Sequence, residues 1–238
     1  MSGTARRRRP RLIGVLIVTG AIFGLLALFA SLSLDEGDTD PIQIDDAGEV
    51  RKLIGGLPQL DERLGEDNAP VTVEVFNDLQ CTDCANWQRD VIEPLIADEA
   101  RAGDVKLLFR HWSMTERPSG IASYGAVAAG FQGQQWQFIE LFFRNQDEAQ
   151  RFGVTQEVLD EIAKGVLNLN IEQWQRDFED PEIPETLEAD DLLAVQRRIP
   201  AEPAVVVTGP GGSRELVETP SLAEIRAAMD PVSAAPGG

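Results

Sequence analysis

The hydrophobic pattern of the chain begins with a nearly unbroken apolar run from Leu12 to Leu34. About 20 apolar residues are enough to cross a bilayer as a helix. Arginines precede the run and acidic residues follow it, an order that leaves the N-terminus in the cytoplasm. The pattern predicts a cytoplasmic basic segment at 1–11 and a single transmembrane anchor at 12–34 in the cell membrane. The rest of the chain is then extracytoplasmic.

A cleaved signal peptide is the alternative interpretation of this segment. Ser31-Leu32-Ser33 has the small residues that a cleavage site needs, but the apolar run is longer than in most signal peptides. In either case the sequence predicts an exported domain, in a compartment where disulfides persist.

The segments on both sides of the predicted domain have no clear periodicity. Residues 35–62 are acidic and contain several glycines and prolines, and we interpret them as a linker. The small residues at 231–238 are typical of a disordered tail. One domain is therefore expected at 63–230.

The domain opens with a pattern typical of a strand, a helix and a second strand. Val71–Phe76 alternates, with its valines on one face. Helical spacing of apolar residues starts at Cys84, and Pro94 should kink that helix. Val105–Arg110 is the second predicted strand. This order predicts a right-handed βαβ unit with parallel strands.

The middle of the domain, at about 115–199, is predicted to be helical. Apolar residues recur at helical spacing in five segments, which start at Ile121, Trp136, Val158, Trp174 and Leu187. Strands are expected at 204–208 and 213–217, and the glycine-rich turn between them indicates an antiparallel hairpin. Ser221-Leu222-Ala223-Glu224 is a capping box that opens a last helix. The expected order is βαβ, a block of helices, and ββα.

Charge and composition exclude some classes of function and of fold. The 238 residues include 40 acidic and 21 basic side chains, for a formal net charge of −19. We exclude nucleic acid as a partner, because binding a phosphate backbone requires a basic face. The chain has only two cysteines, Cys81 and Cys84, so the fold is not held by a framework of structural disulfides.

Cys81-Thr82-Asp83-Cys84 stands where the first predicted strand ends and the helix begins. Unpaired N–H groups at a helix start carry a partial positive charge, which stabilises a thiolate at Cys81. The thiolate is the form that attacks a disulfide. Cys84 lies one turn further on and should be more buried. We expect Cys81 to be the catalytic nucleophile and Cys84 the resolving thiol.

Around these cysteines the sequence resembles the DsbA-like thiol–disulfide oxidoreductases. The similar stretches are Gly65–Val73, Phe76–Cys84, Phe109–His111, Ala126–Ala129 and Gln134–Trp136. The resemblance covers nearly the whole exported part. It implies an α/β, thioredoxin-like fold in which a helical subdomain is inserted between βαβ and ββα.

The resemblance also implies a reaction and its partners. Members of this family oxidise or isomerise disulfides in exported proteins, and many are recharged by a membrane quinone-linked partner. The expected enzyme forms, isomerises or reduces disulfides in exported proteins with cysteines. Its redox group is the disulfide Cys81–Cys84, without another cofactor. Its expected redox partner is a membrane quinone-linked thiol oxidase or a thiol reductase.

Two positions depart from the family pattern. The family often has a buried acid six residues before the first cysteine, where this chain has Val75. Its acid is Glu74, one place earlier, which should point to the other face of the strand. The dipeptide between the cysteines is Thr82-Asp83 instead of the strongly oxidising Pro-His. We therefore expect Thr82 and Asp83 to tune the redox potential.

The resemblance gives Glu202 and Pro203 a substrate-binding role. In thioredoxin-like folds a cis-proline begins the strand that faces the cysteines, and the residue before it lines a groove for an extended peptide. Glu202-Pro203 directly precedes the strand predicted at 204–208, so we expect a cis bond. An ordinary strand-starting proline would be trans. Glu202 and Asp83 would also bring negative charge near Cys81, which disfavours its thiolate and predicts a weaker oxidant.

Two other functions use the same features. The cysteines could belong to a zinc or copper site, but a closed site needs more ligands than one cysteine pair and a single histidine provide. The fold could also serve as a non-catalytic interaction domain. We predict no metal site and expect His111 in a structural position.

Overall fold

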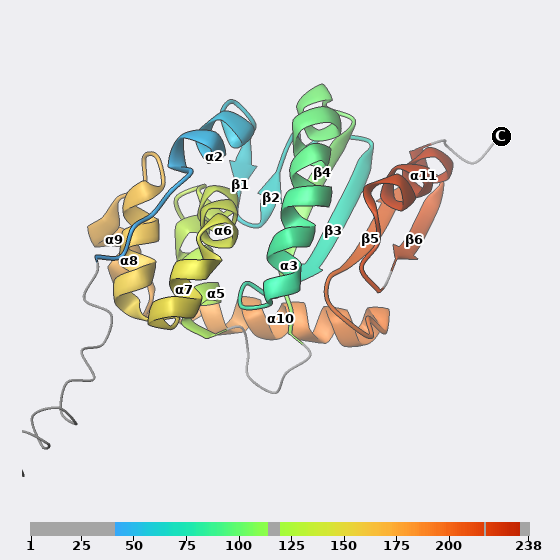
Figure 1. The fold of residues 1–238 in the computed structure, drawn as a ribbon. Helices are drawn as coiled ribbons and strands as arrows, with labels where there is room; N and C mark the ends of the chain where they lie inside the picture. The colour runs from blue at the N-terminus through green and yellow to red at the C-terminus, as the bar shows by residue number, and fades with distance from the viewer. Residues whose placement is uncertain (1–40, 114–119, 217, 234–238) are drawn as a thin grey trace, which may run out of the picture. The chain divides into compact units, whose positions relative to one another are not determined.

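The computed structural model describes residues 41–113, 120–216 and 218–233 (Figure 1). The chain divides into two compact units, Met1–Pro41 and Ile42–Gly238, and the described fold belongs to the second. The anchor predicted at 12–34 lies outside the described residues. Among the helices that are described, none is long and apolar enough to span a membrane.

Six strands form one mixed sheet in the order β1-β2-β4-β3-β5-β6 (Figure 1). The central pair, β3 and β4, is parallel, and the other neighbouring strands are antiparallel. This confirms the predicted βαβ unit and the C-terminal hairpin. The bounds are Gln59–Leu60 (β1), Arg63–Leu64 (β2), Val71–Asn77 (β3), Val105–His111 (β4), Ala204–Gly209 (β5) and Gly212–Leu216 (β6).

The helix after β3 has four consecutive segments. They are α3 (Thr82–Trp87), η1 (Gln88–Ile92), α4 (Glu93–Leu95) and η2 (Ile96–Ala100). The segments on both sides of Pro94, η1 and η2, are π-helical. Proline has no N–H to donate to the preceding turn, so the hydrogen-bond pattern changes around it. The irregularity predicted at Pro94 therefore takes the form of two π-helical segments.

A block of helices separates β4 from β5, as the sequence predicted. The helices are α5 (Gly120–Gly130), α6 (Gln135–Arg144), α7 (Gln146–Phe152), α8 (Gln156–Gly165), α9 (Ile171–Asp177) and α10 (Glu182–Arg197), and α11 (Leu222–Ser233) follows the hairpin. The sequence did not predict α7, because most of its residues are polar and give no apolar period.

The folded domain extends beyond the predicted limits of 63 and 230. Part of the predicted linker 35–62 forms α2 (Ala47–Ile54), in which Val50 and Ile54 are buried. These two residues are four positions apart and therefore share one face of the helix. Part of the predicted tail 231–238 belongs to α11, where Val232 is buried.

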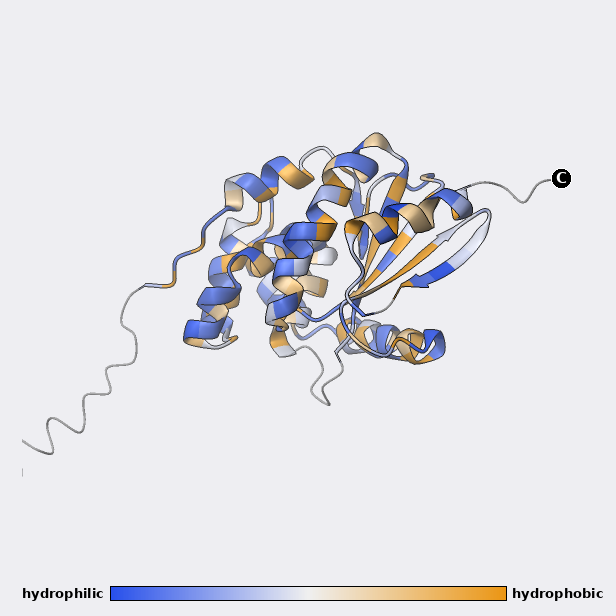
Figure 2. Cartoon of the chain, turned by 45° about the vertical axis from the view of Figure 1, so that its right-hand side comes forward, coloured by the Kyte–Doolittle hydropathy of each residue, from blue (hydrophilic) through white to orange (hydrophobic). Residues whose placement is uncertain are grey.

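The two faces of the sheet pack against different helices. Val73 and Val75 lie on the face covered by the helix that starts with α3 and by α11. On the opposite face, Phe76 and Val206 pack with Ala194 of α10. Figure 2 shows the inner strands as hydrophobic and the outer strand β6 as hydrophilic. The inner strands are thus buried on both sides.

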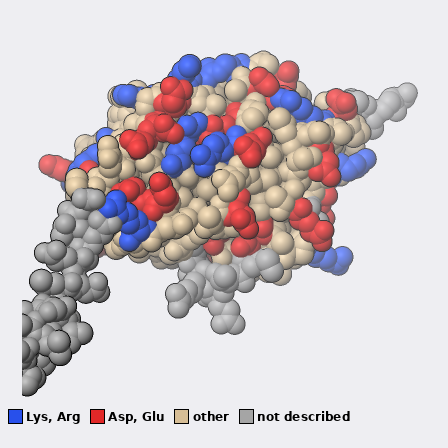
Figure 3. Space-filling model, in the orientation of Figure 1, with Lys and Arg blue, Asp and Glu red and all other residues tan. Residues whose placement is uncertain are grey.

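Most charged side chains lie outside this core. In the view of Figure 3, acidic side chains are spread widely over the surface, and basic ones form several groups, one of them near the middle. That middle lies between α6 and the helix that starts with α3 (Figures 1 and 3). The described surface is therefore not uniformly acidic.

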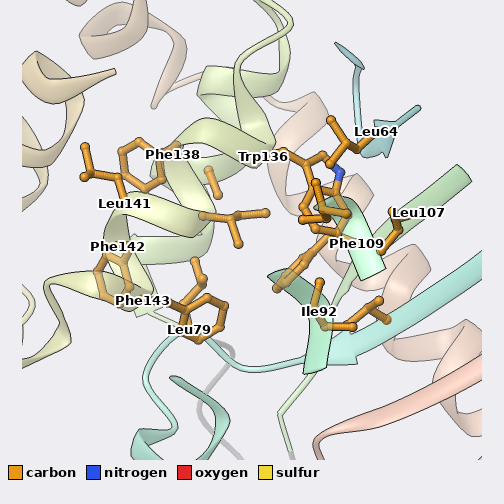
Figure 4. Close-up of a cluster of buried hydrophobic side chains, with 14 of the residues drawn as sticks. Leu64, Leu79, Ile92, Leu107, Phe109, Trp136, Phe138, Leu141, Phe142 and Phe143 are labelled. Atoms are coloured by element: carbon orange, nitrogen blue, oxygen red, sulfur yellow. The ribbon is translucent and has the colours of Figure 1, made fainter. Parts of the chain in front are cut away.

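Helix α6 joins the inserted helices to the sheet. The ring of Trp136 meets that of Phe109 on β4 edge-on, with centroids 5.8 Å apart. Figure 4 shows how the aromatic side chains of α6 extend this cluster towards Leu79, in the loop before the cysteines. Buried aromatic rings contribute large apolar areas to a core. The insertion and the sheet therefore share one hydrophobic core.

Candidate active site

Cys81 and Cys84 form a disulfide at the start of α3, with Cα atoms 5.2 Å apart. Cys81 is the N-cap residue, and its Sγ accepts a hydrogen bond from the backbone N–H of Cys84 at 3.2 Å. Donors at a helix start stabilise negative charge, so the same N–H is placed to support a thiolate after reduction. Cys81 is half-buried and Cys84 is fully buried. This is the difference in exposure that the sequence predicted.

The loop before Cys81 is held from two sides. The backbone N–H of Cys81 donates to the carbonyl of Asp78 at 3.2 Å. From α7, the Nε2 of Gln146 donates to the carbonyls of Leu79 and Cys81 at 2.7 and 2.9 Å. The inserted helices therefore position the backbone of Cys81, the expected nucleophile, directly.

Thr82 and Asp83 lie in the exposed first turn of α3. The hydroxyl oxygen of Thr82 accepts a hydrogen bond from Nε2 of Gln150 on α7 at 3.2 Å. Asp83 is an acid in the first helical turn, where a negative charge favours the helix. Asp83 is two residues after Cys81 in the sequence, and the predicted tuning of the redox potential by its charge stays a prediction.

The bond between Glu202 and Pro203 is cis, as predicted. Pro203 is buried and precedes β5, which pairs with β3. The carbonyl of Pro203 accepts a hydrogen bond from the N–H of Thr219. The carbonyl of Pro220, which follows Thr219, accepts one from the indole N–H of Trp87 at 2.6 Å. Trp87 belongs to α3. These contacts connect the Glu202-Pro203 segment with the helix that carries the cysteines.

Glu74 points away from the cysteines, as its place in the strand predicted. It is buried on the α10 side of the sheet and forms ion pairs with Arg110 and Arg197. Val75 takes the place on the cysteine side and belongs to the apolar core. Neither residue provides an acid beside Cys84.

A buried acid that the sequence analysis missed lies on α6. The side chain of Glu140 has no solvent exposure, and its Oε1 accepts a hydrogen bond from Nε2 of Gln88 at 2.8 Å. Gln88 is one turn after Cys84 on the same helix. Burial, together with the charge of Glu93, raises the pKa of Glu140 to about 8. Its position inside the apolar run Phe138-Ile139-Glu140-Leu141-Phe142 was the available signal.

His111 is buried at the end of β4, in the structural position that we expected. Its Nε2 lies 3.2 Å from Nε2 of Gln135, and its ring packs edge-on against Phe109. Burial and the charge of Arg110 lower the pKa of His111 to about 3, so the ring is neutral at neutral pH. Within the described part of the chain, no group of three or more potential ligands is arranged around a metal position.

Residues 60–230 match a protein-family model described as thioredoxin. The chain belongs to the thioredoxin family. This thioredoxin-family protein is 29% identical over 151 residues to the "probable disulfide bond formation protein D" of Bacillus anthracis, a match that covers 62% of this chain and 70% of that relative.

Two solved structures share its fold. Oxidised BdbD from Bacillus subtilis superposes with a TM-score of 0.63 at 23% identity, over 76% of this chain and 97% of BdbD. Chlamydia trachomatis DsbA superposes with a TM-score of 0.59 at 18% identity, over 71% and 88% of the two chains. The predicted DsbA-like family and thioredoxin-like fold are confirmed. The protein is a thiol–disulfide oxidoreductase of that family, and Cys81 and Cys84 form the disulfide that such an enzyme requires.

Proposed function

We propose that this thiol–disulfide oxidoreductase works outside the cytoplasm, on disulfides of exported proteins. The observation that carries the proposal is the disulfide between a half-buried Cys81 and a fully buried Cys84 at a helix start. The apolar run 12–34 and the arginines before it support a single-pass anchor with a cytoplasmic N-terminus.

The difference in exposure gives the order of the exchange. In the oxidising direction, a client thiolate attacks Sγ of Cys81, a client–Cys81 bond forms, and the Cys81–Cys84 bond breaks. The sulfur of Cys84 leaves as a thiolate and takes up a proton. A second client thiolate then attacks the client sulfur of the mixed disulfide, and Cys81 leaves as a thiolate. Two electrons have moved from the client dithiol to the protein.

The reverse sequence reduces a client disulfide. Isomerisation uses only its first step, after which another client thiolate displaces Cys81 and no net electrons are transferred. The redox partner therefore sets the direction. A quinone-linked thiol oxidase would restore the disulfide between Cys81 and Cys84. A thiol reductase would instead keep both thiols reduced. The relative's name, which refers to disulfide bond formation, supports the oxidising direction.

The charges near the pair favour a moderate potential. Asp83 lies in the first turn of α3, Asp78 lies three residues before Cys81, and Glu202 precedes the cis-proline. Like charge close to a thiolate disfavours it, whereas the helix start favours it. A less stable thiolate makes the disulfide relatively more stable. The protein is therefore proposed as a moderate oxidant, or as an isomerase or reductase.

Trapping of mixed disulfides tests the proposed roles. The Cys84→Ser variant retains the attacking thiol and lacks the resolving one, so it should accumulate mixed disulfides with client proteins. The Cys81→Ser variant should not. Equal trapping by the two variants would overturn the assignment of the nucleophile.

Thiol labelling of the purified protein separates the alternative functions. An oxidoreductase should show a reversible two-electron couple between a dithiol and a disulfide. A zinc- or copper-binding protein would release metal on labelling. An interaction domain would retain its function after both cysteines are replaced.

A further inference from the structure

A groove of about 260 Å³ lies beside the cysteine pair, between α3 and α7. Its walls include Thr82, Asn86 and Arg89 from the helix that starts with α3, and Gln146 and Gln150 from α7. We call it the α3–α7 groove. Because Thr82 directly follows Cys81, a peptide joined to Cys81 has this groove within reach of its neighbouring residues.

The α3–α7 groove lies on a different helix face from the cis-proline. Thr82, Asn86 and Arg89 are spaced by four and three residues and therefore share one face. Trp87 donates to the carbonyl of Pro220 and so lies on the side of the Pro203 segment. At about 3.6 residues per turn, Trp87 points away from the face of Thr82 and Asn86. A client bound along Pro203 would leave the α3–α7 groove open.

The groove contains a buried hydrogen-bond acceptor without a partner. Gln146 is only 5% exposed, and its Oε1 has no hydrogen-bond partner in the described structure. Its Nε2 is bound to two carbonyls, so the oxygen is the atom left unpaired. An unpaired buried acceptor destabilises the fold, and a ligand N–H would remove that cost. The groove is therefore suited to a donor such as a peptide N–H.

The groove also carries an exposed cation. Arg89 makes no direct hydrogen bond or ion pair with a described residue, and it interacts with Glu93, one turn later, only through its charge. Arg144 lines the same groove, although its guanidinium is already paired with Asp46 and Glu93. Asp147 is the one acid among the described residues of the wall.

We propose that the α3–α7 groove binds the residues that flank a client cysteine, and that it selects a carboxylate there. Arg89 pairs with the carboxylate, and Oε1 of Gln146 accepts a backbone N–H of the same segment. This inference rests on the proposed function, because it places the segment while its cysteine is bonded to Cys81. The ligand is a thiol-bearing peptide with an acidic neighbour, supplied either by an exported protein or by a small free peptide thiol.

The test measures how fast short thiols reduce the oxidised full-length protein in detergent. Three cysteine peptides differ only in the flanking residue, which is glutamate, glutamine or lysine. At low salt the wild type should react with the glutamate peptide about threefold faster than with the glutamine peptide, the size expected of an exposed ion pair. In the Arg89→Gln variant that preference should disappear. N-methylation of the peptide bonds beside the cysteine should slow the glutamate peptide further.

The Arg176→Gln variant is the matched control, because it removes an exposed helical arginine of α9 that does not line the groove. It should retain the preference. Glutathione, a free thiol with two carboxylates, distinguishes the sources. Arg89-dependent rates with glutathione alone would identify a small thiol as the ligand, and the same dependence with the peptides would identify protein segments.

Equal rates for the glutamate and glutamine peptides in the wild type would overturn the inference. A preference that survives in the Arg89→Gln variant would overturn it as well. Both results leave the proposed function standing, because the neutral peptide still reduces the protein. If no thiol reduces the disulfide between Cys81 and Cys84, the proposed function itself fails.

Discussion

At the scale of single residues, Glu140 gives the protein a characteristic pH dependence. Burial raises the pKa of its carboxyl group from about 4.5 to about 8. Between pH 4.5 and pH 8, Glu140 is protonated in the folded state and ionised in the unfolded chain. The free energy of unfolding therefore falls as the pH rises, by up to about 1.4 kcal/mol per pH unit.

The window from pH 6.5 to 8 isolates this effect. The lowered pKa of His111 contributes stability above pH 6.5 that is lost only as the pH falls towards 3. The pKa of Asp190 is raised to about 6, so its protonation changes the free energy of unfolding mainly below pH 6.5. We expect urea unfolding of residues 42–238 to show the decline in the wild type and a flat profile in Glu140→Gln. Glu157→Gln, an exposed counterpart on α8, should retain the decline.

The acids near the cysteines give a second residue-scale prediction. We propose that the charges of Asp83 and Glu202 disfavour the Cys81 thiolate, and Asp83→His and Glu202→Thr each remove one of these charges. Both substitutions should raise the reduction potential, towards a stronger oxidant, in a glutathione redox titration. A shift of about 30 mV corresponds to about 1.4 kcal/mol. Shifts below about 10 mV in both variants would show that these acids do not set the potential.

Residues of the site differ in how far the sequence predicted them. The difference in exposure between Cys81 and Cys84 follows from local chain order, because the strand end and the helix start determine which residue is more exposed. Gln146 and Glu140 act across the fold, on Cys81 and Gln88. Such contacts depend on how α6 and α7 dock, which is not encoded in the spacing around the cysteines.

At the scale of elements, a substitution in α2 tests whether the folded domain begins before residue 63. Ile54 is buried against the core although it lies in a segment that reads as a linker. Ile54→Ala should lower the free energy of unfolding by about 2–4 kcal/mol, as for other buried isoleucines. Lys52→Ala, on an exposed position of the same helix, should change it by less than about 0.5 kcal/mol. A small effect of Ile54→Ala would restore the linker interpretation.

The ion pairs under α10 give the next element-scale prediction. Arg110 bridges Glu74 on β3 and Asp190 on α10, both of which are buried. Arg110→Met leaves Asp190 without its cation and Glu74 with Arg197 alone, and it should cost about 3 kcal/mol in urea unfolding. Arg226 also bridges two acids, but its side chain is 40% exposed. Arg226→Met should therefore cost less than about 1 kcal/mol.

Elements with a strong period were predictable and short polar ones were not. The apolar alternation of β3 and the helical spacing of α6 and α8 lead directly to the observed elements. By contrast, α7 and β1 have few apolar residues and depend on tertiary contacts. Local sequence carries little information about elements that packing creates.

At the scale of the whole molecule, the charge and hydropathy of the N-terminus predict its topology. Leu12–Leu34 is long enough to span a bilayer, and the arginines that precede it predict a cytoplasmic N-terminus. Protease added to intact spheroplasts should digest the domain and leave a small membrane fragment. The cytoplasmic fraction of lysed cells serves as the digestion control. A domain that resists protease in intact spheroplasts and is digested only after lysis would contradict this topology.

The two edge strands of the sheet, β1 and β6, affect how the protein interacts with other chains. Unpaired strand edges recruit other chains, and an enzyme that handles incompletely folded clients meets such chains constantly. One margin here, β1, is only two residues long, and the other, β6, carries Arg214 and Glu215 on an exposed strand. Short and charged edges are poor templates for further strands. If the protein acts on unfolded exported chains as proposed, these two edges would disfavour strand pairing with those chains.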